Sequence, residues 1–191
     1  MEMFFTSDHH FSHSAIIKYT DRPFVDVDEM DQELIKRWNE VVGPNDSVFH
    51  LGDFVLGGPD KASQYFAELN GQIHALANHW HHDKKWLPAN VGPCSEYVSK
   101  SGHRVIILPP MVVLELKEYR AGQYNKPLVL CHYQLMRWDR RHYGSWHLFG
   151  HSHGKVRGEG LSFDCGVDTQ NFTPIPLHKV ATIMEMRGEK L

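Results

Sequence analysis

The sequence predicts an α/β fold in which strands and helices alternate at first and strands follow one another later. Three observations predict this class. Two segments carry apolar residues at helical spacing, short apolar runs separate them, and Gly, Pro and Asn stand at their ends. The chain has 191 residues, fewer than the roughly 250 at which single cores divide. We therefore expect one domain over residues 1–191.

The first half predicts three strands separated by two helices. The first helix is expected over residues 29–42, with Asp28 as its cap, because apolar residues recur on one face. Pro59 suits the first turn of the second helix, which an Asn-Gly pair ends. The alternation favours βαβ crossovers and parallel pairing. The expected strands of this half are residues 4–7, 47–51 and 73–76.

The second half predicts successive strands with short turns between them. Its apolar runs are short and rich in Val, Ile, Leu and aromatic residues, as in strands. The expected strands are residues 105–108, 111–116, 128–131, 146–149, 161–165 and 180–186.

Charge and apolar content exclude several classes of protein. The formal net charge of -3 argues against dependence on nucleic-acid backbones, which usually requires a basic excess, so we expect no stable nucleic-acid complex. No run approaches the ~20 apolar residues that span a bilayer, and the first residues lack the features of a signal peptide. Three cysteines without CxxC spacing suit reduced thiols. We expect a cytoplasmic protein that does not engage a membrane.

Metal-binding residue types follow five of the expected strands. The chain holds 15 histidines, and histidine is the commonest metal ligand. Ligands in open α/β sheets bind at the carboxyl ends of strands, where these residues fall. One such residue after a strand is a common loop feature, but five are much less expected by chance. The residues are Asp8 and His10, then Asp53, then Asn78 and His79, then His132, then His151 and His153.

The spacing and the chemistry of these residues predict two metal ions. Asp8 and His10, like His151 and His153, lie two positions apart, so in extended chain they point to the same side and can chelate. Carboxylates, imidazoles and an amide without a thiolate suit ions such as Mn, Fe, Co, Ni or Zn. The candidate ligands are too many for one tetrahedral site and indicate two ions that share a bridging carboxylate.

The ordered set of motifs resembles that of the calcineurin-like metallophosphoesterase family. The set spans residues 8–153, and the subgroup it most resembles is the small bacterial and phage-type phosphoesterases. The motifs that carry the resemblance are Asp8-X-His10, Gly52-Asp53, Asn78-His79, His132 and Gly150-His151-Ser152-His153.

The resemblance implies a four-layer αββα sandwich, two mixed β-sheets flanked by helices, with a dimetal centre at the carboxyl edge. It implies two divalent or trivalent transition-metal ions, of which Mn, Fe or Zn suit the ligands best. Asp53 would bridge the two ions, and His79 would face the substrate phosphate instead of binding metal. The first ion would be held by Asp8, His10, Asp53 and His153. The second would be held by Asp53, Asn78, His132 and His151.

This centre predicts a dimetal phosphoester hydrolase. Two cations about 3.5–4 Å apart can clamp phosphoryl oxygens and lower the pKa of a bridging water, which then attacks phosphorus in line as hydroxide. Without an obvious cap domain, we expect a phosphodiesterase that acts on small or cyclic nucleotide-type diesters.

Three alternatives stay open. A phosphomonoesterase acting on nucleotides or phosphoproteins would use the same ligands. A non-catalytic scaffold of the same fold would show decayed ligands, and a histidine-rich metal store would bind more than two ions.

The loop after the third strand departs from the family pattern of Gly-Asn-His followed by an acid. Ala77 and Trp80 stand at the first and last of these positions, so another group, such as Asp83, would have to orient His79. His81 and His82 are expected more often on the loop surface than at a site. Possible substrate contacts are His13, Arg140 and Arg141, and expected core histidines are His50 and His74.

Overall fold

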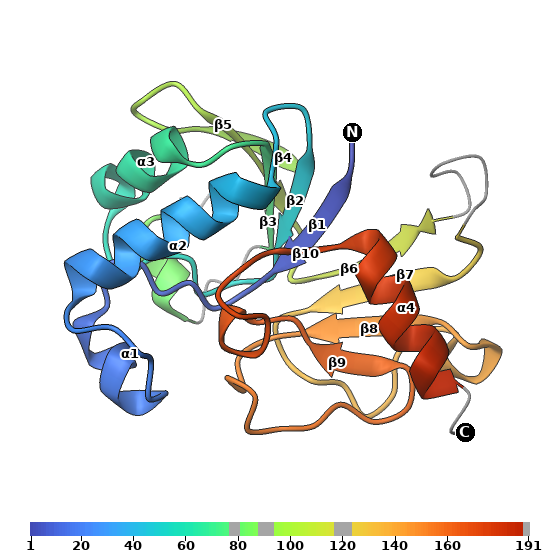
Figure 1. Ribbon diagram of the computed structural model, residues 1–191. Coiled ribbons are helices and arrows are strands. Elements are labelled where there is room, and N and C mark those ends of the chain that lie inside the picture. The colour runs from blue at the N-terminus through green and yellow to red at the C-terminus, as the bar shows by residue number, and fades with distance from the viewer. Residues whose placement is uncertain (77–80, 88–93, 117–123, 189–191) are drawn as a thin grey trace.

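The computed structural model describes residues 1–76, 81–87, 94–116 and 124–188. These residues form a mixed α/β fold, and the predicted α/β class is confirmed (Figure 1). The helices are α1 (Ser14–Tyr19), α2 (Val27–Val41), α3 (Pro59–Glu68) and α4 (Leu177–Gly188). The strands are β1 (Met3–Thr6), β2 (Ser47–His50), β3 (Gln72–Leu76), β4 (Ser95–Val98), β5 (Arg104–Leu108), β6 (Met111–Glu115), β7 (Pro127–Cys131), β8 (Trp146–Phe149), β9 (Ser162–Asp164) and β10 (Ile175–Pro176).

The strands form two mixed sheets. The larger sheet has the order β10-β1-β2-β3-β5-β4, with β1, β2, β3 and β5 parallel and an antiparallel strand at each edge. The smaller sheet has the order β6-β7-β8-β9, with β7, β8 and β9 parallel. A bridge between Ser7 and Gly166 joins the chain beyond β1 to the chain beyond β9. The carboxyl ends of both sets of parallel strands therefore meet at one edge.

Alternation along the strands divides the apolar core into two parts. Phe4 and Val48 face α2 and α3, where Trp38 is fully buried. Their neighbours Phe5 and Phe49 face the smaller sheet and α4. The strands of the larger sheet are thus buried on both faces, which explains their continuous apolar runs. Figure 1 shows α1 to α3 gathered on one side and α4 beside the smaller sheet.

The structure corrects two of the expected elements. The first long helix begins at Val27, because Asp26 accepts a hydrogen bond from the backbone N–H of Glu29 at 2.9 Å and so acts as the cap in place of Asp28. Residues 180–186 belong to helix α4 and not to a strand. Val180 and Met184 lie four residues apart on its buried face, a helical spacing that an apolar run partly conceals.

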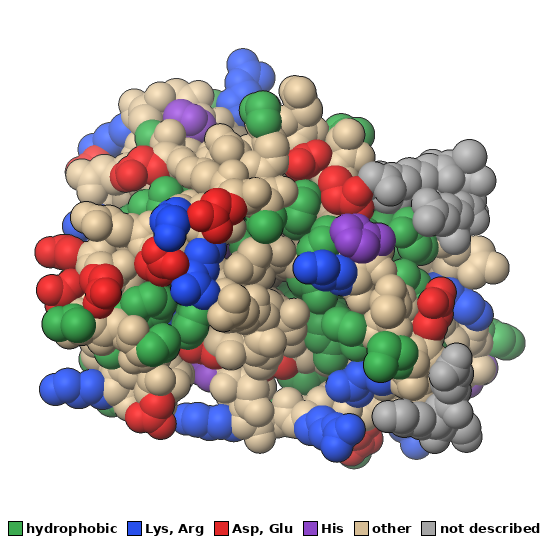
Figure 2. All heavy atoms as spheres, viewed as in Figure 1, with side chains coloured by type: hydrophobic (Ala, Val, Ile, Leu, Met, Phe, Trp, Pro, Cys, Tyr) green, Lys and Arg blue, Asp and Glu red, His purple; other side chains and the backbone are tan. Residues whose placement is uncertain are grey.

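The surface view shows basic and acidic side chains interspersed over one face of the molecule (Figure 2). None of the helices within the described residues combines the length and apolar character that crossing a bilayer requires.

Candidate metal centre

The predicted strand-end residues come together where the two sheets meet. Asp8 and His10 follow β1, Asp53 follows β2, His132 follows β7, and His151 and His153 follow β8. Their side chains form two groups in which the possible ligand atoms all lie within 4.8 Å of one another. The first group is Asp8, His10 and His153, and the second is Asp53, His81, His132 and His151.

Asp53 lies between the two groups. Its Oδ2 is 3.6 Å from Nε2 of His10, 3.4 Å from Nδ1 of His81 and 3.5 Å from Nε2 of His132. Burial alone would raise the pKa of Asp53, but the neighbouring imidazoles outweigh burial and hold it below its ordinary range. Asp53 is therefore an ionised carboxylate in contact with donors of both groups.

Several buried atoms of the centre have no hydrogen-bond partner in the described part of the chain. They are Oδ1 of Asp8, Nε2 of His10, Oδ1 of Asp53 and Nε2 of His132. An unsatisfied buried polar group costs about 1–3 kcal/mol, so four that face one another would be unfavourable unless cations satisfied them. Burial also raises the pKa of Asp8 to about 6, as expected for a carboxylate without a full cationic partner. The donor set fits metal ions.

The backbone at these residues is unusual. Asp8, His10, Asp53, His151 and His153 all have positive φ angles, between 49° and 66°. This left-handed conformation is uncommon for non-glycine residues and clusters at functional sites. Backbone hydrogen bonds connect the turn after β1 to the turn after β2: Asp8 N–H donates to Gly52 O and His10 N–H donates to Asp53 O, each at 3.0 Å. The strained turns direct alternate side chains, such as those of Asp8 and His10, into one small volume.

Close packing fixes the Asp8 carboxylate. Its Oδ2 accepts a hydrogen bond from the backbone N–H of His151 at 2.9 Å. A Cβ atom on Gly150 would lie 2.4 Å from this oxygen and 2.3 Å from Oγ of Ser7. A Cβ atom on Gly166 would lie 2.8 Å from Oδ2 of Asp8. Glycine is thus required beside the carboxylate for steric reasons.

A buried ion pair that the sequence reasoning missed orients the first group. Asp168 accepts a hydrogen bond from His153 Nδ1 at 2.7 Å and two from Arg22, at 2.8 and 2.9 Å. Arg22 also donates to the backbone carbonyls of Asp8 and His9. Burial alone would raise the pKa of Asp168, but the bonds from His153 and Arg22 lower it to about 2. A carboxylate that fixes the second nitrogen of a ligating histidine is a common outer partner of metal sites.

One signal in the sequence could have found Asp168. It follows β9 by four residues, so it lies near the same strand edge as the other acidic residues. Arg22 gives no such signal, since 146 residues separate it from Asp168 in the chain.

A pocket of about 370 Å³ opens beside the two groups. It is lined by ligand candidates from both groups together with His13 and His82, and Tyr19 and Lys155 lie at its exposed side. The His13 ring is close to that of His10, with their Nδ1 atoms 3.3 Å apart. His13, expected as a possible substrate contact, thus lies in the pocket, as do His81 and His82.

The other expected residues have three different outcomes. Asn78 and His79, with Ala77 and Trp80, lie outside the described residues. Arg140 pairs with Glu115 and Asp139, and Arg141 stacks on Trp138 and lines a separate cavity of about 550 Å³. The structure does not bring either arginine into the pocket beside the ligands. His50 and His74 lie in strands; His50 is fully buried and His74 stacks on Phe49.

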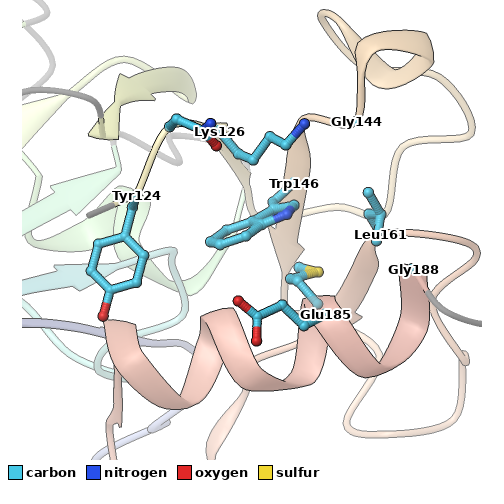
Figure 3. Close-up of a pocket in the computed structure, with 9 residues that line it drawn as sticks. Tyr124, Lys126, Gly144, Trp146, Leu161, Glu185 and Gly188 are labelled. Carbon is cyan, nitrogen blue, oxygen red and sulfur yellow. The ribbon is translucent and has the colours of Figure 1, made fainter. Parts of the chain in front are cut away.

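A further cavity, of about 260 Å³, lies at the opposite end of the smaller sheet. Figure 3 shows Tyr124, Lys126, Trp146 and Glu185 around it. Trp146 is the first residue of β8, so this cavity adjoins the amino end of a strand whose carboxyl end leads to the metal ligands. It therefore belongs to a different part of the molecule.

Comparisons with known proteins support the fold. No family model matches the chain. It is 27% identical to the uncharacterized protein MJ1445 of Methanocaldococcus jannaschii over 193 residues, which is 96% of this chain and 92% of that protein. It is 39% identical to the Gene 66 protein of Mycobacterium phage L5 over 72 residues, 38% of this chain and 30% of that protein.

A solved structure has a similar fold. The crystal structure of the protein of unknown function AQ665 from Aquifex aeolicus matches with a TM-score of 0.67 and 19% sequence identity, over 95% of this chain and 98% of that chain. At this identity the match shows the fold and nothing of the chemistry.

Proposed function

We propose that the protein is a dimetal phosphoester hydrolase, and more narrowly a phosphodiesterase for small or cyclic nucleotide-type diesters. One observation carries the proposal: two groups of carboxylate and imidazole donors, linked by the buried carboxylate of Asp53, converge beside an open pocket. Two transition-metal ions bound by such groups supply a nucleophile near neutral pH and neutralise charge on phosphoryl oxygens. The ligand chemistry suits Mn, Fe or Zn.

The surrounding residues would keep the donors in place during turnover. Arg22 and Asp168 hold the His153 ring and the Asp8 backbone, and Gly150 lets the Asp8 carboxylate approach the turn before His151. Such preorganisation lowers the cost of assembling charges around the reacting phosphorus. His13 and His82 line the pocket and can donate hydrogen bonds to phosphoryl oxygens.

The lining of the pocket favours a diester over a monoester. Among its described residues Lys155 is the one lysine or arginine, and Arg22 is already bonded to Asp168 and to backbone carbonyls. A phosphomonoester, with a second pKa of about 6, is largely a dianion at neutral pH, whereas a diester carries one charge. Beyond the two metal ions, this single side-chain cation suits the smaller charge.

The finer fold assignment belongs to the same proposal. A calcineurin-like αββα sandwich would place a dimetal centre at the carboxyl edge of two mixed sheets. The order of the sheets, the two-part core and the position of the donor groups are compatible with that arrangement.

The test is hydrolysis of a chromogenic phosphodiester and of the corresponding monoester, after chelation and reloading with Mn²⁺. We expect metal-dependent cleavage of the diester that exceeds cleavage of the monoester. The Asp53→Asn variant should lose this activity, and Asp60→Asn, at an exposed acid, should retain it. A preference for the monoester would overturn the narrower proposal. Hydrolysis of neither ester by a protein that binds two ions would overturn the proposed function.

A further inference from the structure

His81 lies in the donor centre, whereas the sequence predicts it more often at the loop surface. It lies in the second donor group with Asp53, His132 and His151. Its ring centroid is 4.8 Å from that of His151 and 5.2 Å from that of His132. The side chain is only 22% exposed. His81 is therefore turned into the centre and not out to solvent.

The distances around Asp53 resemble those among ligands and not those of hydrogen bonds. Three imidazole nitrogens lie 3.4–3.6 Å from one carboxylate oxygen, whereas a charged N–H···O⁻ hydrogen bond is about 2.7–2.9 Å long. Donors that surround an ion at about 2.1 Å lie roughly 3.0–3.4 Å apart. Three imidazolium ions around one oxygen would also repel one another. Neutral imidazoles that share cations with Asp53 account for the arrangement.

The turn that carries His81 is fixed to the second strand. The buried carboxylate of Asp83 accepts hydrogen bonds from the backbone N–H of Phe54 at 2.9 Å and from Nε1 of Trp86 at 2.6 Å. Phe54 directly follows Asp53. Asp83 therefore couples the position of His81 to that of the bridging carboxylate, as a preorganised metal site requires.

We infer that His81 is a ligand of the ion held by Asp53, His132 and His151, and that His82 faces the phosphoester. The role of His82 rests on the proposed phosphoesterase function; the role of His81 needs only a bound ion.

His82 suits a substrate contact better than a ligand. Its ring centroid is 4.9 Å from those of both His10 and His13, and it lines the open pocket. His82, His10 and His13 form a third set of possible ligands, which contains no carboxylate, so a cation held there would lack a compensating negative charge. An anionic phosphoryl group in the pocket would instead accept hydrogen bonds from these rings.

The experiment counts bound ions in the full chain. Wild type and the variants His81→Ala, His82→Ala and His142→Ala are chelated, reloaded with Mn²⁺ at a fixed free concentration and analysed for metal content. Co²⁺-loaded samples are compared by visible absorption, which responds to the loss of an imidazole ligand. His142 is an exposed histidine outside the centre and serves as the matched control. Thermal melting of the chelated samples verifies that each variant folds.

We expect two ions in wild type, His82→Ala and the control. His81→Ala should retain one ion, with affinity for the second at least ~100-fold weaker, more than the loss of an outer partner usually costs. Its Co²⁺ spectrum should change, while that of His82→Ala should not. Two tightly bound ions in folded His81→Ala, fewer than two in wild type, or loss of an ion from His82→Ala would overturn the inference.

Hydrolysis is measured separately on the same samples. His82→Ala should hydrolyse the diester more slowly despite full metal content, and an unchanged rate would overturn its assigned role. If wild type binds two ions and hydrolyses neither ester, the proposed function fails, yet the ion count of His81→Ala still decides whether His81 is a ligand.

Discussion

Buried histidines occur both at the carboxyl edge, where His10 and His132 lie, and inside the strands, where His147 lies, but their ring nitrogens have different partners. His147, in β8, lies 3.1 Å from Val129 O through Nδ1 and accepts from Leu135 N–H through Nε2 at 3.1 Å. At the edge, the Nε2 atoms of His10 and His132 have no hydrogen-bond partner among the described residues and face Asp53.

This contrast shows that burial alone does not identify a ligand. A histidine with both nitrogens satisfied contributes to packing, whereas one with a free nitrogen directed at a carboxylate is suited to bind metal. His9 has a free ring nitrogen but lacks a carboxylate partner among the described residues. One of its nitrogens is 3.0 Å from His50 and the other has no partner in the described chain, but Phe11 and Trp38 surround the ring. A buried histidine is therefore suited to bind metal only where it has both a free ring nitrogen and a carboxylate beside it.

The strongest test of this contrast removes the shared carboxylate. We expect Asp53→Ala to weaken binding of both ions by at least ~100-fold, because Asp53 contacts imidazoles of both groups. Isothermal titration of the chelated protein with Mn²⁺ measures both affinities. Asp60→Asn, an exposed acid, is the control. If Asp53→Ala still bound one ion with wild-type affinity, the two groups would be independent and the bridge would be wrong.

The second test changes the outer partner of the first group. Asp168→Asn should weaken one ion by ~10–100-fold, because the neutral amide no longer fixes the His153 ring as strongly. It should also lower the free energy of unfolding of the chelated protein by about 3 kcal/mol, since buried Arg22 loses its counter-charge. Metal titration and urea unfolding measure the two effects. Equal weakening of both ions would contradict the division into two groups.

Much of the edge could be predicted from the sequence, for a physical reason. Asp8, Asp53 and His132 each follow an apolar run closely, and parallel strands deliver their ends to the same edge. The position of His81, in the loop after β3, could not be predicted. Several adjacent residues of that loop have suitable chemistry, and only the fold brings His81 beside Asp53. The hydrogen bond between Arg22 and Asp168 joins residues 146 positions apart, a separation at which periodicity carries no information. The apolar run over residues 180–186 predicts a strand where the chain forms helix α4, because so short a run suits either structure.

The third test concerns packing at the edge. Gly150→Ala should lower the free energy of unfolding by about 3 kcal/mol, the upper part of the usual cost of overpacking, because its Cβ would lie 2.3 Å from Ser7 Oγ and 2.4 Å from Asp8 Oδ2. Gly58→Ala is the matched control, since nothing lies within 4 Å of its added Cβ. Urea unfolding compares the two variants. Equal stability in both would show that the carboxylate is free to move.

The last test examines an interior histidine. Burial lowers the pKa of His147 from 6.5 to about 4. Because the folded value lies below the unfolded one, the unfolded chain takes up the proton first as the pH falls. The contribution of this residue to stability is therefore present above pH 6.5 and is lost progressively between pH 6.5 and pH 4. The loss between pH 7 and pH 5 should be about 2 kcal/mol.

The His147→Gln variant isolates this contribution. Its amide offers one acceptor and one donor to replace the two ring nitrogens, but it does not titrate. Because the variant does not share the loss, its free energy of unfolding relative to wild type should rise by about 2 kcal/mol between pH 7 and pH 5, measured by urea unfolding with chelator present. His103→Gln, at an exposed position, should follow wild type. A wild-type pH dependence retained in His147→Gln would mean that the edge histidines, and not this satisfied interior one, control acid stability.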